Sequence, residues 1–380
     1  MQTPPLGVKS IRKVVSETMV NVAVIGLGKM GISHLSIANA LNGMTVLGVC
    51  DSNTMVGNAL EKYSGLAYFK DYNEVLGLKD LQAAIIATPS QLHEPIIRAA
   101  LDRNLHVFCE KPLTLSGAVS TELSELASRL GLVSQVGYHN RFIATFGEVQ
   151  RLLASGAIGT VSHVLAEAYG PVVLRPSRAT WRTTSSAGGG CLFDYAAHPL
   201  NLLNWYFGKP LGCTGAVLKS MFSSETDDEV YATLQFGEGV TGQLSVNWSD
   251  ESVRKMSTKI SIWGSGGKIY ADRQELQVYI RSNDTAPEGY GAGWNVKYTT
   301  DLTSPVSFYL RGEEYSAQLE NFAAACNERR IDNANDFASA AVTDISLEQI
   351  RNAAAGHGGL IAQAPRRPAA SGLRRLIGRR

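Results

Sequence analysis

Three glycines near the start of the chain have a spacing with a defined chemical use. The motif Gly26-Leu-Gly28-Lys-Met-Gly31 directly follows the apolar run Val22–Ile25. In such a turn the first glycine permits a tight bend, the second leaves room for a pyrophosphate, and the third lets a helix pack closely on the strand. The helix would begin with free backbone N–H groups and a partial positive charge, which stabilise phosphate oxygens. The motif predicts a dinucleotide-binding turn; the alternative is a loop that only reverses the chain.

A carboxylate that follows the next apolar run sharpens this prediction. Asp51 stands 20 residues beyond Gly31 and follows the run Thr45–Val49. At that distance a carboxylate can accept hydrogen bonds from the adenosine ribose hydroxyls. A 2′-phosphate would meet its negative charge, and Ser52-Asn53-Thr54 contains no arginine to compensate. The sequence therefore predicts NAD and disfavours NADP; the alternative is that Asp51 caps a helix.

A lysine and a histidine further along the chain could move a proton. Lys111 follows the apolar run His106–Cys109, and ligands of open α/β sheets bind at the carboxyl ends of the strands. An ammonium group there can donate to a substrate hydroxyl and stabilise the oxygen as negative charge develops. The imidazole of His198, with an ordinary pKa of about 6.5, can take a hydroxyl proton near neutral pH. A solvated surface lysine is the alternative for Lys111.

Asp194 and His198 are four residues apart, and such a pair shares one face of a helix. In that arrangement Asp194 would either adjust the pKa of His198 or contact a substrate hydroxyl. Pro199 complicates the assignment, because proline inside a helix costs about 3 kcal/mol outside the first turn. Either a helix restarts at Pro199, or a turn before it places the two side chains.

The elements that must position these residues form two groups. As far as about Gly137, apolar β-branched runs alternate with helix-length segments, which predicts a doubly wound parallel sheet. The predicted strands are Val22–Ile25, Thr45–Val49, Ala84–Ala87, His106–Cys109 and Val133–Val136, and the predicted helices are Ser33–Leu41, Glu94–Arg103 and Gly117–Leu130.

Beyond about Arg141 the pattern changes to that of a largely antiparallel sheet with glycine-bearing turns. Three helices accompany it, and the fold class is therefore α/β, with a Rossmann domain followed by an α+β domain. The predicted strands are Thr160–Tyr169, Val217–Phe222, Val230–Phe236, Val240–Trp248, Lys259–Trp263 and Lys268–Ala271, and the predicted helices are Phe146–Ser155, Glu313–Arg329 and Phe337–Asn352.

Several segments match one known family in residue type, order and spacing. They are Gly26–Gly31 followed by His34, Ala87-Thr-Pro-Ser-Gln-Leu-His93, Glu110-Lys-Pro112, and Gly188-Gly-Gly190 with Asp194 and His198. In these features the chain resembles the Gfo/Idh/MocA oxidoreductases, in detail from about Asn21 to Gly208 and more loosely to about Asn352. The combination of Glu-Lys-Pro with the later Asp-x-x-x-His is the most specific part of the resemblance.

The resemblance implies a nicotinamide-dependent hydride transfer at a secondary alcohol of a sugar, an inositol or a nucleotide-linked sugar. It implies that Lys111 and His198 meet beside the nicotinamide, that the Lys111–Pro112 peptide is cis, and that the open second sheet forms a homodimer or homotetramer interface. Two alternatives remain. One is a nucleotide-sugar ketoreductase working in the reductive direction, and the other is a non-catalytic dinucleotide-binding regulatory protein.

The expected site residues combine the motifs with the resemblance. The catalytic set is Lys111, His198 and Asp194. The cofactor set is Gly26, Gly28, Lys29, Met30, Gly31, Asp51, Thr88, Pro89, His93, Glu110 and Lys111. The substrate set is Lys111, Tyr138, Asn140, Arg141, Trp181, Arg182, Asp194, His198 and Asn201, with Arg175 and Arg178 as weaker additions.

Some of these residues have equally plausible structural uses. His93 would then be a helix residue bonded to the backbone, and Tyr138, Asn140 and Arg141 would serve packing. Asn201 stands where the family often has a further aspartate, which points to altered substrate contacts; otherwise it is a polar group on a helix surface.

Composition excludes several classes of protein. The chain has 380 residues, 44% of them apolar and 18% charged, and a formal net charge of +1. It can therefore bury a core and has no overall basic field for nucleic acid. No apolar run approaches the roughly 20 residues of a membrane span. The five cysteines are scattered without a C-x-x-C pair, which indicates reduced thiols in the cytoplasm and no metal site.

We expect four segments along the chain. An N-terminal extension covers 1–19, the Rossmann domain 20–140, the α+β substrate and oligomerisation domain 141–362, and a basic tail 363–380. From Arg366 to Arg380 there are six arginines and no acid. Such a tail is expected to be solvated and without fixed structure.

Overall fold

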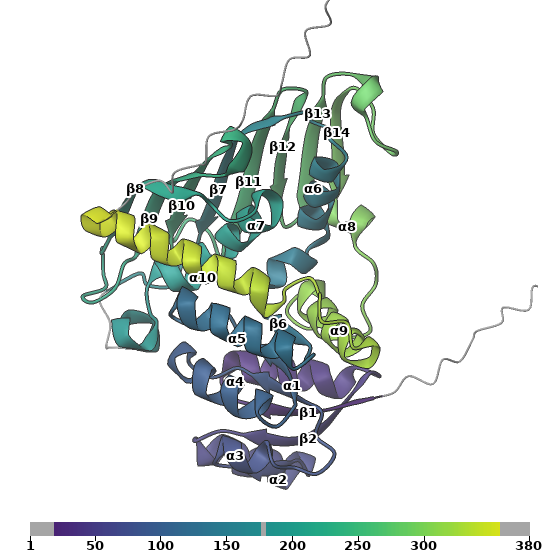
Figure 1. Ribbon diagram of the computed structural model, residues 1–380, viewed down its shortest axis with the longest axis vertical. Coiled ribbons are helices and arrows are strands. Elements are labelled where there is room, and N and C mark those ends of the chain that lie inside the picture. Colours follow the sequence, from purple (N-terminus) through teal and green to yellow (C-terminus); the bar gives the residue numbers. More distant parts are fainter. Residues whose placement is uncertain (1–18, 176–179, 358–380) are drawn as a thin grey trace, which may run out of the picture.

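The computed structural model describes residues 19–175 and 180–357 (Figure 1). The predicted N-terminal extension, apart from Met19, and the predicted basic tail lie outside these residues, as does Arg178. The described chain builds two β-sheets that lie at opposite ends of the molecule, with helices between them (Figure 1).

The first sheet has six parallel strands in the order β3-β2-β1-β4-β5-β6, which is the order of a doubly wound dinucleotide-binding domain. Its strands are β1 (Val20–Ile25), β2 (Met44–Cys50), β3 (Ala67–Phe69), β4 (Ala83–Ile86), β5 (His106–Cys109) and β6 (Ser134–Val136). Its helices are α1 (Lys29–Ala40), α2 (Thr54–Ser64), α3 (Tyr72–Val75), α4 (His93–Leu101) and α5 (Gly117–Arg129).

All five strands predicted for this region are present, and most of them are apolar because they are buried on both faces. Every residue of β4 is buried, and β1 has a single partly exposed position. The exception is β6, whose buried residues include Ser134 and Gln135. The prediction missed β3 and the helices α2 and α3. Strand β3 has only three residues, none of them buried, so its apolar stretch is too short to mark a strand.

The second sheet has eight strands in the order β14-β13-β12-β11-β7-β10-β9-β8. Only β7 and β10 run parallel; the other neighbours are antiparallel. The strands are β7 (Val161–Tyr169), β8 (Gly212–Lys219), β9 (Glu229–Gln235), β10 (Thr241–Asn247), β11 (Ser257–Gly264), β12 (Gly267–Asp272), β13 (Glu275–Ile280) and β14 (Gly293–Tyr298). The predicted fold class is therefore confirmed.

Two details of the predicted second sheet were wrong. The expected strand Val217–Phe222 is instead Gly212–Lys219, because the backbone N–H groups of Met221 and Phe222 turn to donate to the Asp228 carboxylate at 2.6 and 2.7 Å. Strands β13 and β14 were missed. In β14 no residue is buried, so an edge strand of this kind gives a weak apolar signal.

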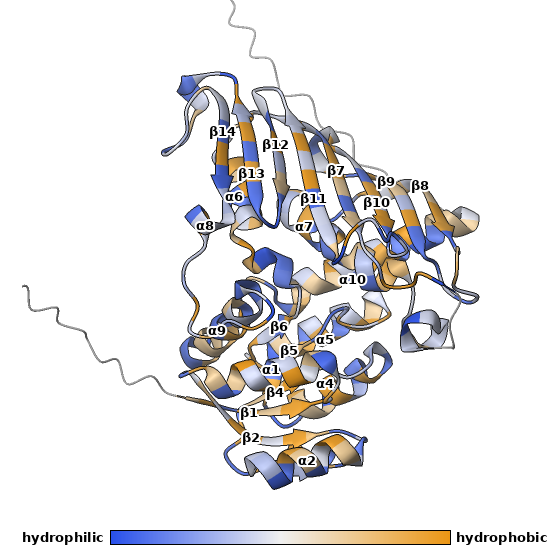
Figure 2. Ribbon diagram, turned by 180° about the vertical axis from the view of Figure 1, so that it is seen from behind, coloured by the Kyte–Doolittle hydropathy of each residue, from blue (hydrophilic) through white to orange (hydrophobic). Residues whose placement is uncertain are grey.

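Helices cover only one face of the second sheet. Helices α6 (Ala144–Ala154) and α7 (Ala197–Phe207) pack against that face. The opposite face is seen in front in Figure 2, where no helix lies over the strands. The short helix α8 (Thr299–Leu302) follows the edge strand β14.

Two long C-terminal helices join the two sheets. Helix α10 (Phe337–Asn352) packs against both α5 and α7, and α9 (Glu313–Glu328) packs against α1. Figure 1 shows both helices in the layer between the sheets. Within the described residues, no helix has the length and apolar character needed to span a bilayer.

Candidate active site

The glycine motif forms the predicted turn between β1 and α1. Gly26 has a φ of +94°, which other residues rarely adopt. A Cβ on Gly31 would lie 1.7 Å from the Gly26 carbonyl oxygen, whereas a Cβ on Gly28 would meet no heavy atom within 4 Å. The third glycine therefore allows close packing, and the second faces open space beside the start of α1. A pyrophosphate fits this combination, with Lys29 and Met30 in the first helical turn.

Asp51 belongs to the same turn. Its Oδ2 accepts a hydrogen bond from the Leu27 backbone N–H at 2.5 Å, and its Oδ1 accepts one from the Asn53 N–H at 2.6 Å. Helix α2 is capped by Asn53 instead, so the alternative role of Asp51 as a helix cap is not the one observed. The carboxylate thus stands beside the glycine turn, where a ribose diol can donate to its remaining lone pairs.

His93 connects two loops at the carboxyl edge of the first sheet. It is buried; its Nδ1 lies 2.9 Å from the Pro112 carbonyl oxygen, and its Nε2 lies 3.0 Å from that of Thr88. The backbone-bonded alternative for His93 is therefore the arrangement found. Both loops line the edge predicted to hold the nicotinamide, with Pro89 directly after Thr88. The Thr88 hydroxyl is buried and has no partner among residues 19–175 and 180–357.

Glu110 is held by a buried histidine. Its Oε1 lies 2.7 Å from His34 Nε2, and its Oε2 accepts from the Lys111 N–H at 3.2 Å. Burial would raise the pKa of Glu110, but the hydrogen bond and charge of His34 outweigh burial, and the pKa is lowered. A Cβ at Gly137 would lie 3.1 Å from this carboxylate, so the glycine after β6 makes room for it.

Lys111 and Asp194 form a buried ion pair that joins the two sheet regions. The Lys111 Nζ donates to the Asp194 Oδ1 at 2.5 Å and to its carbonyl oxygen at 2.7 Å. Arg182 donates to the other carboxylate oxygen at 3.0 Å. Burial opposes ionisation of Asp194, but these two cations outweigh it, so its pKa is lowered. The Lys111–Pro112 peptide is cis, as the resemblance implied.

A π-helical turn, Leu192–Ala196, carries Asp194, and α7 begins directly after it at Ala197. Pro199 therefore lies in the first turn of α7, where proline is tolerated. Because the turn is wider than an α-helix, the argument from four-residue spacing fails. Asp194 instead binds Lys111 and Arg182, and burial, Lys111 and Arg273 set the pKa of His198.

His198 is buried against aromatic and imidazole rings. The ring centroid of His139 lies 4.8 Å away and that of Tyr138 lies 6.2 Å away. Burial, followed by the charges of Lys111 and Arg273, holds the pKa of His198 well below its ordinary value. Its Nδ1 is buried and has no hydrogen-bond partner in the described chain. A neutral imidazole is thus available near neutral pH, with Nε2 left to accept a proton.

The predicted substrate residues behave in two different ways. The Tyr138 hydroxyl and both amide atoms of Asn140 are buried without partners in the described segments. Arg141 and Asn201 instead bind each other, with Arg141 Nε donating to Asn201 Oδ1 at 2.8 Å, and the Asn201 amide donates to Thr343 at 3.0 Å. Arg141 and Asn201 thus have partners within the protein, and their substrate contacts stay a prediction. Asn201 is buried, so the alternative of a polar group on a helix surface is not the one observed.

Trp181 and Arg182 lie at the entrance to this group of residues. The Arg182 guanidinium lies 4.5 Å from the centre of the Trp181 ring while it also binds Asp194. Trp181 is 42% exposed. The structure therefore brings Arg182 to the Asp194 carboxylate and leaves an aromatic face beside it.

Two charged or titratable residues of the site were missed by the sequence analysis. His139 lies between His198 and Tyr315, and Arg273 acts on the pKa of His198 from the turn between β12 and β13. The sequence could have indicated His139 as a site residue, because it follows β6 at the carboxyl edge of the first sheet. Nothing in the sequence indicates Arg273, since only the tertiary fold places the turn between β12 and β13 near α7.

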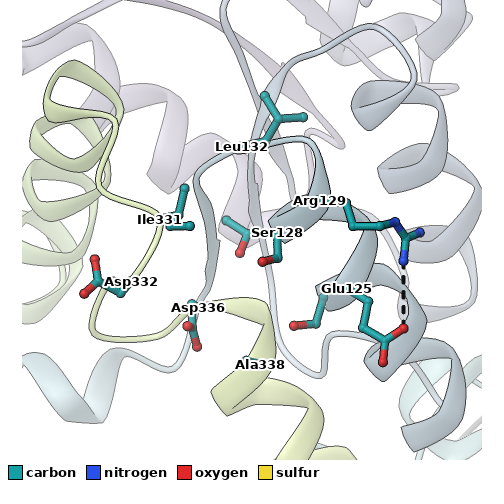
Figure 3. Close-up of a pocket in the computed structure, with 10 residues that line it drawn as sticks. Glu125, Ser128, Arg129, Leu132, Ile331, Asp332, Asp336 and Ala338 are labelled. Atoms are coloured by element: carbon teal, nitrogen blue, oxygen red, sulfur yellow. Dashed lines mark ion pairs between the residues drawn. The ribbon is translucent and has the colours of Figure 1, made fainter.

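One surface cavity lies away from these residues. A cavity of about 520 Å³ opens between α5 and the segment that leads into α10, lined by Glu125, Ser128, Asp332 and Asp336 among others (Figure 3). Neither Lys111 nor His198 lines it. Among the described residues, no cluster of three or more histidine, cysteine, aspartate or glutamate side chains is placed to hold a metal ion.

Comparison with known proteins gives two family matches. Residues 20–138 match the oxidoreductase family with an NAD-binding Rossmann fold, and residues 146–270 match the GFO/IDH/MocA C-terminal domain. The cofactor of this fold is NAD, in agreement with the glycine turn and Asp51.

Individual relatives are distant in sequence. The chain is 26% identical to levoglucosan dehydrogenase of Pseudarthrobacter phenanthrenivorans, covering 71% of this chain and 78% of the relative. It is 26% identical to the NAD⁺-dependent scyllo-inositol 2-dehydrogenase of Bacillus subtilis, covering 67% and 74%. It is 27% identical to inositol 2-dehydrogenase of Salmonella typhimurium, where the match spans 48% of this chain and about half, 53%, of the relative.

Solved structures share the whole fold. A levoglucosan dehydrogenase in complex with NADH and L-sorbose superposes with a TM-score of 0.79 at 22% identity, covering 90% of this chain and 99% of that one. The two family matches together span more than half of the 380 residues. The chain belongs to the Gfo/Idh/MocA family of NAD-binding oxidoreductases.

Proposed function

We propose that this protein oxidises a secondary alcohol of a sugar, an inositol or a nucleotide-linked sugar, with NAD as the hydride acceptor. The convergence of Lys111, Asp194 and His198 at the carboxyl edge of the first sheet carries the proposal. Lys111 comes from the loop after β5, whereas Asp194 and His198 come from the π turn and α7. These groups meet beside the glycine-turn domain that holds the cofactor.

The side chains divide the reaction between them. NAD⁺, when bound at the glycine turn, would supply the acceptor for the hydride that leaves the alcohol carbon. Lys111 uses two of its three N–H donors on Asp194, so the third is left for the substrate oxygen and stabilises its developing negative charge. His198 takes the hydroxyl proton at Nε2, and its lowered pKa keeps the ring neutral before the proton arrives. Asp194 holds the ammonium in place and is itself held by Arg182.

Support for the substrate class comes from the relatives and from the site. Proteins named as inositol and levoglucosan dehydrogenases are similar to this chain, and their substrates are polyhydroxylated rings. The unpartnered Tyr138 hydroxyl and Asn140 amide are groups of the type that bind sugar hydroxyls. The exposed Trp181 ring beside Arg182 suits the apolar face of a sugar ring or a nucleotide.

A screen of substrates tests the proposal. Inositols, free sugars and nucleotide-linked sugars would be mixed with NAD⁺ or NADP⁺, and the absorbance of the reduced cofactor would be followed. We expect turnover with at least one polyol and a preference for NAD⁺. Reduction of a keto-sugar by NADH, with no measurable oxidation, would instead favour the ketoreductase alternative. Tight NADH binding without any hydride transfer would favour the non-catalytic regulator.

We also propose that the open face of the second sheet joins copies of this chain. One end of that face carries Trp263, Tyr270, Tyr279 and Trp294 in mutual ring contact, with Lys268 over two of the rings. An exposed aromatic patch of this kind marks an interaction surface. Light scattering of the full chain is expected to give a dimer or tetramer, and Trp294→Glu is expected to shift it towards monomer. A monomeric wild-type protein would reject this proposal.

A further inference from the structure

His198, the base of the proposed reaction, is the first in a column of contacting rings that continues with His139 and Tyr315. His139 lies 4.8 Å from His198 with an angle of 59° between the ring planes, and it stacks on Tyr315 at 4.7 Å and 22°. The Arg311 guanidinium lies 5.3 Å from the centre of the Tyr315 ring. His198 also contacts the Tyr138 ring, with the ring centroids 6.2 Å apart and an interplanar angle of 85°. His198 thus has two neighbouring rings.

Hydrogen bonding does not provide the same restraint. A functional histidine is commonly oriented by a hydrogen bond from its second ring nitrogen to a carboxylate or carbonyl. In His198 the Nδ1 atom is buried and has no partner in the described parts of the chain. The carboxylate four residues earlier, Asp194, is already bound to Lys111 and Arg182. The ring plane of His198 must therefore be set by packing.

We propose that His139 is a positioning residue that fixes the ring plane of His198, and that Tyr315 keeps His139 in place. This inference rests on the proposed function, in which His198 accepts the hydroxyl proton at Nε2. A ring that cannot tilt keeps that nitrogen directed at the substrate, and small misplacements of a reacting group cost rate. His139 contributes through its ring face and takes no part in the proton transfer.

The support for this column comes from segments far apart in the sequence. His139 begins the short helix η2 (His139–Phe142) after β6, and Tyr315 lies in the first turn of α9. The start of α9 is tied to the second sheet, because Arg273 binds Glu314 at 2.5 Å. Both imidazoles are buried, and their pKa values lie well below the ordinary value. Two neutral rings can pack in this way without repulsion between charges.

Two substitutions separate ring packing from imidazole chemistry. His139→Phe keeps a flat ring of similar size, whereas His139→Ala removes it. With the polyol found active in the substrate screen, we expect His139→Ala to lower kcat roughly 10- to 100-fold, with NADH affinity within a few-fold of wild type. His139→Phe should restore most of the lost kcat. As a control, His163→Ala removes another histidine ring, which lies 5.5 Å from the Trp263 ring on the second sheet at an interplanar angle of 38°, and should leave kcat unchanged.

Wild-type kcat in His139→Ala would overturn the inference. A His139→Phe variant as slow as His139→Ala, with thermal unfolding like that of wild type, would also overturn it, because the nitrogen atoms would then be essential. A second readout needs no turnover: the imidazole proton resonances of His198, assigned with His198→Gln, report the stacked ring in the substrate-free protein. They should move in His139→Ala and return in His139→Phe. If no polyol reacts with wild type, the proposed function fails while these resonances still test the positioning.

Discussion

The two halves of the candidate site are built differently. In the cofactor half, which is the glycine turn and the loops after β2 and β4, Asp51 and His93 bind backbone groups of neighbouring loops. Asp51 accepts from the Leu27 N–H, and His93 faces the carbonyls of Thr88 and Pro112. The substrate half is Lys111 with residues 138–141 and 181–201, and it leaves the Tyr138 hydroxyl and the His198 Nδ1 without partners in the described chain.

This difference shows how each half achieves its geometry. In the cofactor half, the Asp51 carboxylate and the His93 imidazole hold loops together. The substrate half is fixed by a few strong contacts, chiefly the pair Lys111–Asp194, and keeps polar atoms available for recognition. Changes in the first half should therefore affect cofactor binding, and changes in the second should affect turnover.

The largest expected effect is on turnover. Lys111→Ala removes the donor to the substrate oxygen, and we expect kcat to fall by about 10²–10⁴. NADH affinity, measured by fluorescence titration, should stay within a few-fold, because the glycine turn is untouched. Lys111→Met keeps the aliphatic chain and should be equally slow. Full activity in either variant would mean that the two halves do not divide their roles in this way.

A pair of glycine substitutions gives the next largest effect. Gly28→Ala places a methyl group in open space, so thermal unfolding should be unchanged while NADH affinity falls at least 10-fold through contact with the pyrophosphate. Gly31→Ala forces a Cβ to within 1.7 Å of the Gly26 carbonyl oxygen. It should lower both NADH affinity and stability, the latter by roughly 1–3 kcal/mol as in overpacking. Equal melting temperatures for the two variants would contradict the packing role of the third glycine.

Cofactor selectivity should change with Asp51. Asp51→Ser removes the carboxylate that accepts from the Leu27 N–H and is expected to accept from the ribose. Loss of a hydrogen bond to a charged group costs about 1.5–3 kcal/mol, so kcat/KM with NAD⁺ should fall about 10- to 100-fold. The preference for NAD⁺ over NADP⁺ should shrink, because the repulsion of a 2′-phosphate is removed. An unchanged ratio of the two kcat/KM values would show that selectivity comes from another group.

The smallest effect concerns the helix that supports both halves. Asp344 of α10 accepts hydrogen bonds from the Thr114 N–H and the Ser120 hydroxyl, and burial raises its pKa to about 7. A raised pKa means that the folded state favours the neutral acid. Its contribution to stability is therefore largest below the unfolded value near 3.8 and is lost as pH rises through about 7.

Thermal unfolding checks this contribution. Between pH 5 and pH 8 the Tm of wild type relative to that of Asp344→Asn should fall by a few degrees as pH rises. The difference between the two proteins is the measurement, because the lowered pKa values of the buried His139 and His198 raise stability with pH in this range in both of them. The lowered pKa values of Glu110 and Asp194 act in the same sense as these histidines, but only at lower pH, where those carboxylates begin to take up protons. A Tm difference that is constant across this range would exclude a titrating Asp344.

Much of the fold and the cofactor half could be predicted from sequence, because their signals are local. A parallel strand is a short apolar run, and a glycine turn with a later aspartate is a spacing of a few tens of residues. The substrate half depends on contacts between distant segments. Asn201 was placed in the substrate set because of its position after His198. In the structure its amide binds Arg141 and Thr343, which lie 60 and 142 residues away in the sequence.

The position of Asp194 illustrates the same limit. A spacing of four residues predicts one helical face only when the helix is regular, and here a π turn intervenes. No local sequence pattern around Leu192–Ala196 predicts the π turn. Gly190, directly before this segment, has a φ of +115°. The Asp227 carboxylate accepts a hydrogen bond from the Leu192 N–H at 2.6 Å, which is a tertiary contact at the start of the turn.

Helix α10 has a mechanical consequence for the whole molecule. It packs on α5 below the first sheet edge and on α7 beside the second sheet, and Asp344 and Glu348 both anchor it to the segment around Thr114 and Gly117. Moving the two sheets apart would break these contacts along the full length of α10. The spacing between the two sheets is therefore set in part by a helix that carries neither Lys111 nor His198.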